Sequence, residues 1–124
     1  MIPEKFYDVL KHEGVVTIVT SNAEGPHVVN TWNTYLVVTK DEKILIPAYA
    51  MRKTEKNINQ NNKITLALGA REVMGYKDYQ GTGFVVEGTA KFLSSGAEYD
   101  EMKAKFSFLT RVLEVTPSSA KQMI

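Results

Sequence analysis

The chain has 124 residues, 44% of them hydrophobic and 23% charged, with no cysteine and a formal net charge of +1. This composition predicts a single soluble domain, residues 1–124, and excludes disulfides, thiol catalysis and zinc–cysteine sites. The balanced charge, without clustered Lys and Arg, argues against nucleic-acid binding. No signal peptide and no apolar run near the roughly 20 residues that span a bilayer can be found, so we expect a cytoplasmic protein that does not enter a membrane.

Apolar spacing predicts a helix at the start of the chain, followed by a hairpin. The residues that would form its buried face recur three or four positions apart: Ile2, Phe6, Val9 and Leu10. Residues 14–20 form a predicted strand and Ser21–Gly25 a turn. Residues 26–38 are then the returning strand, or two strands broken near the polar stretch 30–35.

The rest of the chain continues with short strands and two further helices. A third strand, 44–46, is expected to stop at Pro47, and a helix is expected to follow with Thr54 as its N-cap. Residues 64–68 alternate as a strand, residues 72–83 are a predicted loop, and residues 84–92 show the cleanest alternation in the chain. Gly88 interrupts this strand and predicts a bulge or a bend.

The C-terminal third combines a helix with a last strand. Its predicted helix carries apolar residues at spacings of three and four: Tyr99, Met102, Phe106 and Leu109. Residues 111–115 are the last predicted strand, and 117–123 a helical or extended tail. About six strands with turns at short intervals favour an antiparallel barrel with helical caps over a βαβ fold.

The polar stretch Asn30–Tyr35, which holds the only Trp, is unusual between two apolar segments. In a strand, Asn30, Trp32 and Thr34 would face one side, and Thr31, Asn33 and Tyr35 the other. Buried polar groups need partners, so this stretch is either a binding surface or simply a polar edge strand or hairpin.

Two cations, Arg52 and Lys53, stand directly before the predicted helix start at Thr54. Helix N-termini disfavour cations, because the macrodipole makes that end positive. The arrangement suits an anion, on which free N–H groups, a hydroxyl and the two cations would converge. The alternative is a solvated basic loop.

Other chemical motifs are weak. Gly81-Thr82-Gly83 lacks the third glycine of a dinucleotide fingerprint, and no Walker loop occurs. His12 and His27 have no second-ligand spacing, so no metal is expected. No residue has the pattern of a dedicated acid, base or nucleophile, and the catalytic residues stay unknown.

Several ordered blocks strongly resemble the small FMN-binding proteins of sulfate-reducing bacteria, within the pyridoxamine 5'-phosphate oxidase-like flavoprotein superfamily. The blocks are Gly25–Leu36, Pro47, Met51–Asn57 and Gly81–Phe84, and the likeness spans essentially the whole chain. The resemblance implies a six-stranded antiparallel split β-barrel with short capping helices. It also implies a homodimer with one FMN per subunit near the interface.

The resemblance further implies which residues bind FMN. Lys53 and Thr54 match the phosphate-binding pair, while Asn30, Thr31 and Asn33 match residues that bind the phosphate, ribityl chain or ring edge. Trp32 matches an aromatic beside the flavin. The backbone that would line the isoalloxazine comprises Pro47, Ala48, Tyr49, Ala50 and Met51.

Some matched positions depart from the family pattern. Tyr49 and Ala50 replace two glycines, so their side chains either narrow the approach to the ring or stack on it. Phe108 stands where the partner subunit lends a Trp to the flavin, and the terminal Ile124 where the partner lends a Leu. Glu13 matches a position near the flavin and is a candidate for tuning its potential, or a solvated carboxylate at a helix end.

These features predict a flavoprotein with an unidentified redox partner, in which FMN supplies the redox chemistry. It would act as an electron carrier, or as an NAD(P)H or flavin reductase. Bulk at Tyr49 and Ala50 favours the carrier. Pyridoxamine-phosphate oxidase activity is disfavoured because only Lys121 is basic after Arg111. The other class of protein considered is a cofactor-free binding module, such as a small barrel that binds oligonucleotides. The balanced charge disfavours oligonucleotide binding, which needs a basic groove.

Overall fold

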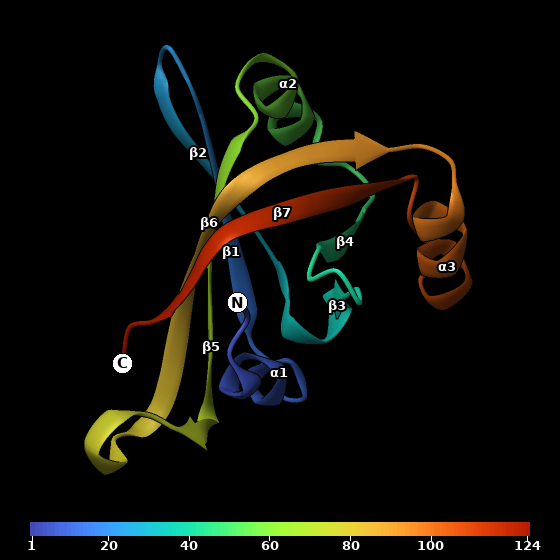
Figure 1. Cartoon of the computed structure of the whole chain (residues 1–124). Coiled ribbons are helices and arrows are strands. Elements are labelled where there is room, and N and C mark those ends of the chain that lie inside the picture. Colours follow the sequence, from blue (N-terminus) through green and yellow to red (C-terminus); the bar gives the residue numbers. More distant parts are fainter.

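The computed structural model describes residues 1–124 as one antiparallel sheet with three helices (Figure 1). The helices are α1 (Glu4–Leu10), α2 (Arg52–Gln60) and α3 (Ala97–Lys105). The strands are β1 (Val15–Asn22), β2 (Gly25–Trp32), β3 (Val37–Val38), β4 (Ile44–Ala48), β5 (Lys63–Met74), β6 (Gln80–Leu93) and β7 (Arg111–Gln122). The expected mainly β, antiparallel fold is thereby confirmed.

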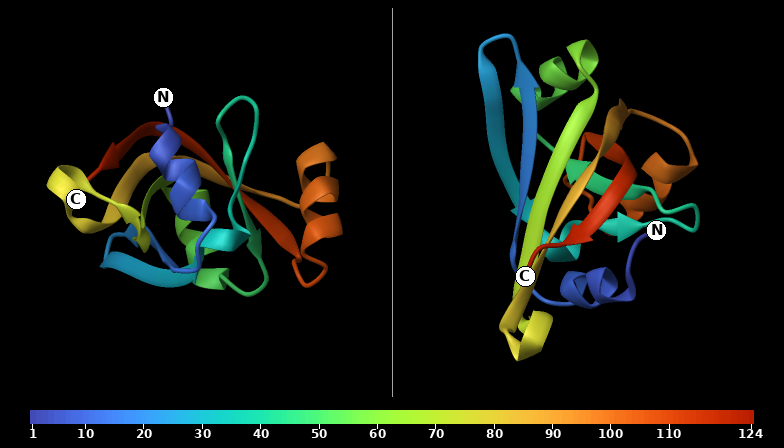
Figure 2. Two further views of the ribbon diagram at one scale, coloured as in Figure 1. Left: turned by 90° about the horizontal axis from the view of Figure 1, so that it is seen from below. Right: turned by 60° about the vertical axis from the view of Figure 1, so that its left-hand side comes forward.

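The sheet has seven strands in the order β2-β1-β5-β6-β7-β4-β3. The expectation of six was wrong because a 3-10 turn at Asn33–Tyr35 separates β3 from β2. The two edge strands, β2 and β3, are not paired with each other, so the sheet curves without closing into a barrel (Figure 2). The period-two alternation expected across residues 30–35 therefore ends at Trp32.

Several predicted boundaries also move. The strand expected to stop at Pro47 runs on to Ala48, with Pro47 opposite Val112, because proline removes a donor but not the extended conformation. Most of the predicted loop 72–83 belongs to β5 and β6, which pair as far as Met74 and Gln80. The predicted tail after residue 116 continues β7 to Gln122.

The helix boundaries differ as well. Helix α2 begins at Arg52, so Thr54 is not its N-cap; Met51 holds that place in a left-handed conformation with φ 51° and ψ 35°. Helix α3 ends at Lys105, and Phe106 is its C-cap. Leu109 lies beyond the helix but packs with Met102 in a small apolar cluster beneath it. The hydrophobic spacing thus located the packing correctly and the helix end wrongly.

The main core lies between the curved sheet and helix α1. Phe6 of α1 is fully buried, with its ring 5.5 Å from that of Phe84 on β6. Burying one such side chain contributes about 1.5–3 kcal/mol. The predicted first helix and the hairpin at Ser21–Gly25 are confirmed. None of the three helices has both the length and the apolar character needed to cross a bilayer.

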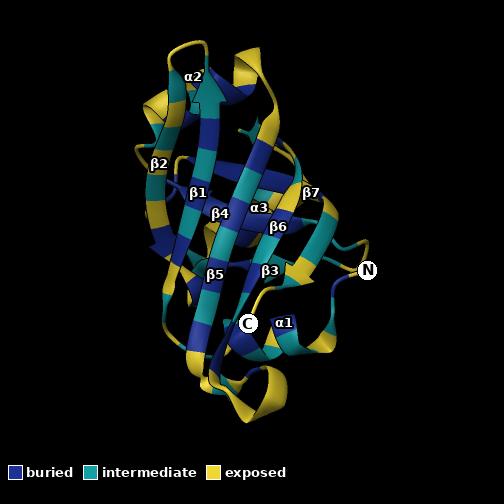
Figure 3. Ribbon diagram, turned by 90° about the vertical axis from the view of Figure 1, so that its left-hand side faces the viewer, coloured by how far each residue is buried: buried dark blue, intermediate teal, exposed yellow.

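The helices leave one face of the sheet uncovered. Figure 3 shows β2, β1 and β5 with no helix in front of them. Three large apolar side chains on this face are exposed: Val15, Val28 and Trp32. These apolar side chains, between which the hydrogen-bonded pair Thr17 and Asn30 lies, leave a mixed sheet face available to a partner surface.

The predicted bulge at Gly88 is confirmed, because the register of β6 against β7 shifts between Glu87 and Gly88. A Cβ at Gly88 would overlap the carbonyl oxygen of Thr116 and come within 2.9 Å of the Cα of Pro117. Both are backbone atoms of a paired strand and cannot turn away. Gly88 is therefore required by close backbone approach.

We expect Gly88→Ala to lower the free energy of unfolding by about 1–3 kcal/mol, because the new methyl overpacks the ladder. Urea unfolding measures the change. Gly83→Ala on the same strand is the control, since its Cβ would meet its nearest atom at 3.4 Å, an ordinary contact. Equal stability of the two variants would show that β7 moves aside freely.

Candidate functional site

Six consecutive backbone N–H groups, from Tyr49 to Thr54, donate no hydrogen bond within the chain. They cover the connection from β4 to α2 and the first turn of that helix, which has no side-chain cap. Helix N-termini leave their first N–H groups free, but here the run extends three residues further back. Successive free N–H groups at a helix start are suited to binding an anion.

The carbonyl oxygens of the same segment are all engaged. Those of Ala48 and Met51 accept backbone bonds from Thr110 and Glu55, each of 2.9 Å. Those of Tyr49 and Ala50 accept bonds of 2.8 and 2.6 Å from the Arg111 guanidinium. The segment therefore has free donors, while its carbonyl oxygens are directed at partners within the chain.

Two cations stand at the start of α2, and they differ in their partners. Arg52 lies 3.6 Å from the Glu55 carboxylate. Lys53 is exposed and has no ion-pair or hydrogen-bond partner, so its ammonium is free to pair with an anion. A free cation therefore stands at the same helix start as the free N–H groups, as the order of charges in the sequence predicts.

Thr54 is completely buried, and its Oγ1 has no hydrogen-bond partner. A buried hydroxyl without a partner costs about 1–3 kcal/mol. The Thr54 hydroxyl lies in the first turn of α2, where it would donate a hydrogen bond to a bound anion. Thr54 was expected as a helix cap, and it lies instead inside the first turn of the helix as an unpartnered donor.

The position of α2 is fixed by an amide that the sequence did not single out. Asn57 is buried. Its Nδ2 donates a hydrogen bond of 3.1 Å to Thr20 Oγ1 of β1, and its Oδ1 accepts one of 3.1 Å from Asn22 Nδ2. The one signal of its burial in the sequence was its position three residues after Thr54, which places the two side chains on the same face of a polar helix. These bonds hold the middle of α2 against strand β1.

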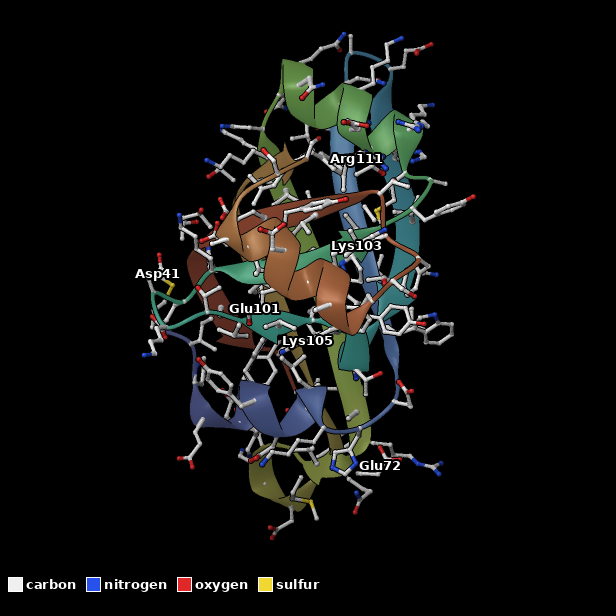
Figure 4. All side chains as sticks on the ribbon, turned by 90° about the vertical axis from the view of Figure 1, so that its right-hand side faces the viewer. Asp41, Glu72, Glu101, Lys103, Lys105 and Arg111 are labelled. Atoms are coloured by element: carbon white, nitrogen blue, oxygen red, sulfur yellow. The ribbon has the colours of Figure 1, made fainter.

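Arg111 is the other residue that sequence reasoning missed as part of this region. Figure 4 shows it at the start of β7, next to α2. Its side chain is 7% exposed, and its Nε donates to Glu55 Oε1 over 3.1 Å. A single Arg opening the buried run Val112–Val115 was the signal that the sequence held.

The polar stretch divides between surface and interior. Asn30 is exposed, where its Oδ1 accepts a 3.0 Å bond from Thr17, and Trp32 is 49% exposed, whereas Thr31 is buried. Asn33 is fully buried; its Nδ2 donates to the carbonyl oxygens of His12 and Gly69 over 3.1 and 2.9 Å. Only its Oδ1 lacks a partner. The amide of Asn33 thus ties the end of α1 to β5.

A shallow hollow of about 360 Å³ is lined by Glu13, Trp32 and Tyr35. Glu13 accepts a 2.9 Å bond from Thr34. The Tyr35 ring in turn lies 5.5 Å from that of Phe108, which is 44% exposed. This side of the molecule therefore presents a set of partly exposed aromatic rings.

Ile124 lies away from this region. Its carbonyl oxygen accepts a 2.6 Å bond from Thr82, and its main chain passes close to Gly75. Figure 1 shows the C-terminus at the opposite end of the sheet from α2. Within one chain, Ile124 and Lys53 do not share a site.

The other hollows and charges do not add up to a second site. Two polar hollows, of about 210 and 420 Å³, lie near the Gly88 bulge. The two carboxyl groups whose pKa is lowered, Asp41 by the Thr39 hydroxyl and Glu42 by the Ile2 N–H, sit in the turn before β4. No three His, Asp or Glu side chains lie together as metal ligands.

The chain is similar to known proteins along its whole length. Residues 2–123 match the family model of pyridoxamine 5'-phosphate oxidase. The chain is 41% identical to the FMN-binding protein of Nitratidesulfovibrio vulgaris over 124 residues, the full length of both. A HupZ structure from Group A Streptococcus matches with a TM-score of 0.80 at 20% identity, covering 99% of this chain and 94% of that one.

An FMN-binding protein from Syntrophomonas wolfei is a second solved structure with this fold. It has a TM-score of 0.68 at 16% identity, and the match covers 88% of this chain and 76% of that chain. At such identities the two structures establish a common fold and nothing finer.

We expect Thr54→Val to stabilise the ligand-free protein by about 1 kcal/mol, because valine has a similar shape and removes an unpartnered buried hydroxyl. Thr20→Val is the control, since that hydroxyl accepts a bond from Asn57 and its loss should destabilise. Thermal unfolding without ligand measures both. Destabilisation by Thr54→Val would show that the hydroxyl already has a partner.

Proposed function

The chain belongs to the pyridoxamine 5'-phosphate oxidase family, and from this premise we propose that it is an FMN-binding electron-transfer protein. The observation that carries the proposal is the run of six free N–H groups from Tyr49 to Thr54. A flavin phosphate is an anion that needs such donors. The 41% identical relative is itself an FMN-binding protein.

The phosphate would bind at the start of α2. There it would accept hydrogen bonds from free N–H groups and from Thr54 Oγ1, the buried hydroxyl without a partner. Lys53 would supply the charge, since Arg52 is already near Glu55. Charge-assisted bonds of this kind are about twice as strong as neutral ones.

The ring would lie along the segment before the helix. Pro47 and Ala48, which are buried, would form its floor, while Tyr49, Ala50 and Met51 would bring the free N–H groups. Asn30 and Trp32, exposed on the neighbouring edge strand, would contact the ribityl chain and ring. Thr31 and Asn33 are buried, so they would support the strand from inside and not contact the flavin. Only Asn33 Oδ1 has no partner within the chain and would be free to accept a hydrogen bond.

We infer a homodimer with each FMN near the subunit interface. The uncovered face of β2, β1 and β5 exposes apolar side chains that a second copy would bury. Ile124 lies at the far end of the sheet from α2, so its role over a flavin would require the other subunit's site. Phe108 lies partly exposed beside Tyr35 in its own chain and would contact the flavin of the partner subunit.

When bound, FMN supplies the redox chemistry, and the chain binds and orients it. No carboxylate or imidazole lies free beside the six N–H groups: Glu55 is held by Arg111, and the histidines are on other elements. Tyr49, 65% exposed, would cover part of one ring face. The one carboxylate near Trp32, that of Glu13, accepts a hydrogen bond from Thr34. A partly covered ring without a free acid or base beside the donors suits electron transfer to a redox partner.

The phosphate assignment is tested by Lys53→Met, with flavin binding followed by quenching of flavin fluorescence. We expect FMN affinity to fall about tenfold to a hundredfold, the loss of one charge-assisted bond, while riboflavin affinity stays unchanged. Lys56→Met is the control, because Lys56 is exposed one turn along the same helix. Equal effects of the two variants, or a wild-type protein that binds no FMN, would contradict the proposal.

A further inference from the structure

Arg111 makes an unusually complete set of contacts for a single side chain. Its two terminal nitrogens donate to the carbonyl oxygens of Tyr49 and Ala50, over 2.8 and 2.6 Å. The terminal nitrogen that bonds Tyr49 also donates a hydrogen bond of 2.7 Å to Thr110 Oγ1. The Thr110 hydroxyl in turn donates a hydrogen bond of 3.1 Å to the Tyr49 carbonyl oxygen. The planar fork therefore holds two successive carbonyls at once, which a single ammonium point charge would not do.

The guanidinium is itself held firmly. Its Nε donates 3.1 Å to Glu55 Oε1 in the first turns of α2, and its Cζ lies 5.3 Å from the centre of the Phe92 ring. With a side chain only 7% exposed, Arg111 is a buried cation whose charge is compensated by Glu55. It links β7, the segment 49–51 and the start of α2.

The orientation of two N–H groups follows from these contacts. A trans peptide is planar, with its N–H pointing opposite to its C=O, and the chain contains no cis peptide bond. Because the carbonyls of Tyr49 and Ala50 point at Arg111, the N–H groups of Ala50 and Met51 point away from it. Neither N–H has a partner in the chain.

We propose that Arg111 is a positioning residue that turns the Ala50 and Met51 N–H groups outward, as a pair of fixed donors to the flavin ring. This inference rests on the proposed function, since it places the ring beside this segment. Arg111 touches the backbone of the segment and would act on the ring only through that backbone. Its role is to fix, before binding, where two donors stand.

Two consequences distinguish this role from general stabilisation. Fixed donors favour the ring most when it carries extra electrons, so they raise the reduction potential of the bound flavin. They also act on the ring, which FMN and riboflavin share, and not on the phosphate. Loss of Arg111 should therefore weaken the binding of riboflavin as well as that of FMN, whereas loss of Lys53 should weaken the binding of FMN alone.

The test compares Arg111→Met and Arg111→Lys with the wild-type protein. Affinities for FMN and for riboflavin are measured by fluorescence, and the midpoint potential of bound FMN by dye-coupled titration. Arg71→Met is the control, because Arg71 is exposed and makes no ion pair. Circular dichroism checks the fold; if Arg111→Met does not fold, Arg111→Lys, which keeps the charge, decides.

We expect each folded Arg111 variant to bind both FMN and riboflavin about tenfold or more weakly, and the potential of bound FMN to be lower than in the wild-type protein. Arg71→Met should change neither quantity. Unchanged potential, or weakening confined to FMN, would overturn the positioning role while leaving FMN binding intact. Absence of FMN binding by the wild-type protein would instead overturn the proposed function.

Discussion

Four consecutive carbonyl oxygens, from Ala48 to Met51, accept hydrogen bonds from within the chain, and this constraint decides what the segment offers to a ligand. With the acceptors turned inward, the six N–H groups from Tyr49 to Thr54 are left without partners. The donors to these carbonyls come from residues 110–111, where β7 begins, and from α2, two regions distant in sequence that meet at this point. The strained left-handed Met51, with φ 51°, joins the segment to the helix so that loop and helix N–H groups form one run.

The same constraint organises the charges. Glu55 compensates Arg111 and lies 3.6 Å from Arg52, so Lys53 is the cation left free at the helix start. Thr54 Oγ1 adds a buried donor whose cost falls on the ligand-free protein. A site of this kind lowers the stability of the empty fold in exchange for affinity, which is common where function and folding compete for the same groups. Asn57 limits the loss by tying the helix to β1.

Local chemistry made part of this site predictable from the sequence. Two cations in the first turn of a helix break the rule set by the helix dipole, and such a local conflict marks Lys53 and Thr54 as candidate site residues from the residue order alone. Arg111 could not be found in that way, because its partners are backbone carbonyls 61 and 62 residues away, which carry no sequence signature. Asn33 presents a related difficulty, since a polar residue in a polar stretch can serve the interior as well as the surface. The seven strands were undercounted because a 3-10 turn, which leaves no periodic pattern, separates β2 from β3.

Amide-resolved NMR can show whether the flavin phosphate and ring bind to the free N–H groups of residues 49–54. A ¹⁵N-labelled sample is titrated with FMN, and chemical shifts and hydrogen exchange of each backbone amide are followed. We predict that the amides of Tyr49 to Thr54 shift together and gain protection, and that riboflavin reproduces the changes at Ala50 and Met51 more fully than those at Lys53 and Thr54. Unchanged exchange across residues 49–54, with shifts confined to another surface such as the hollow at Gly88, would contradict binding at this segment.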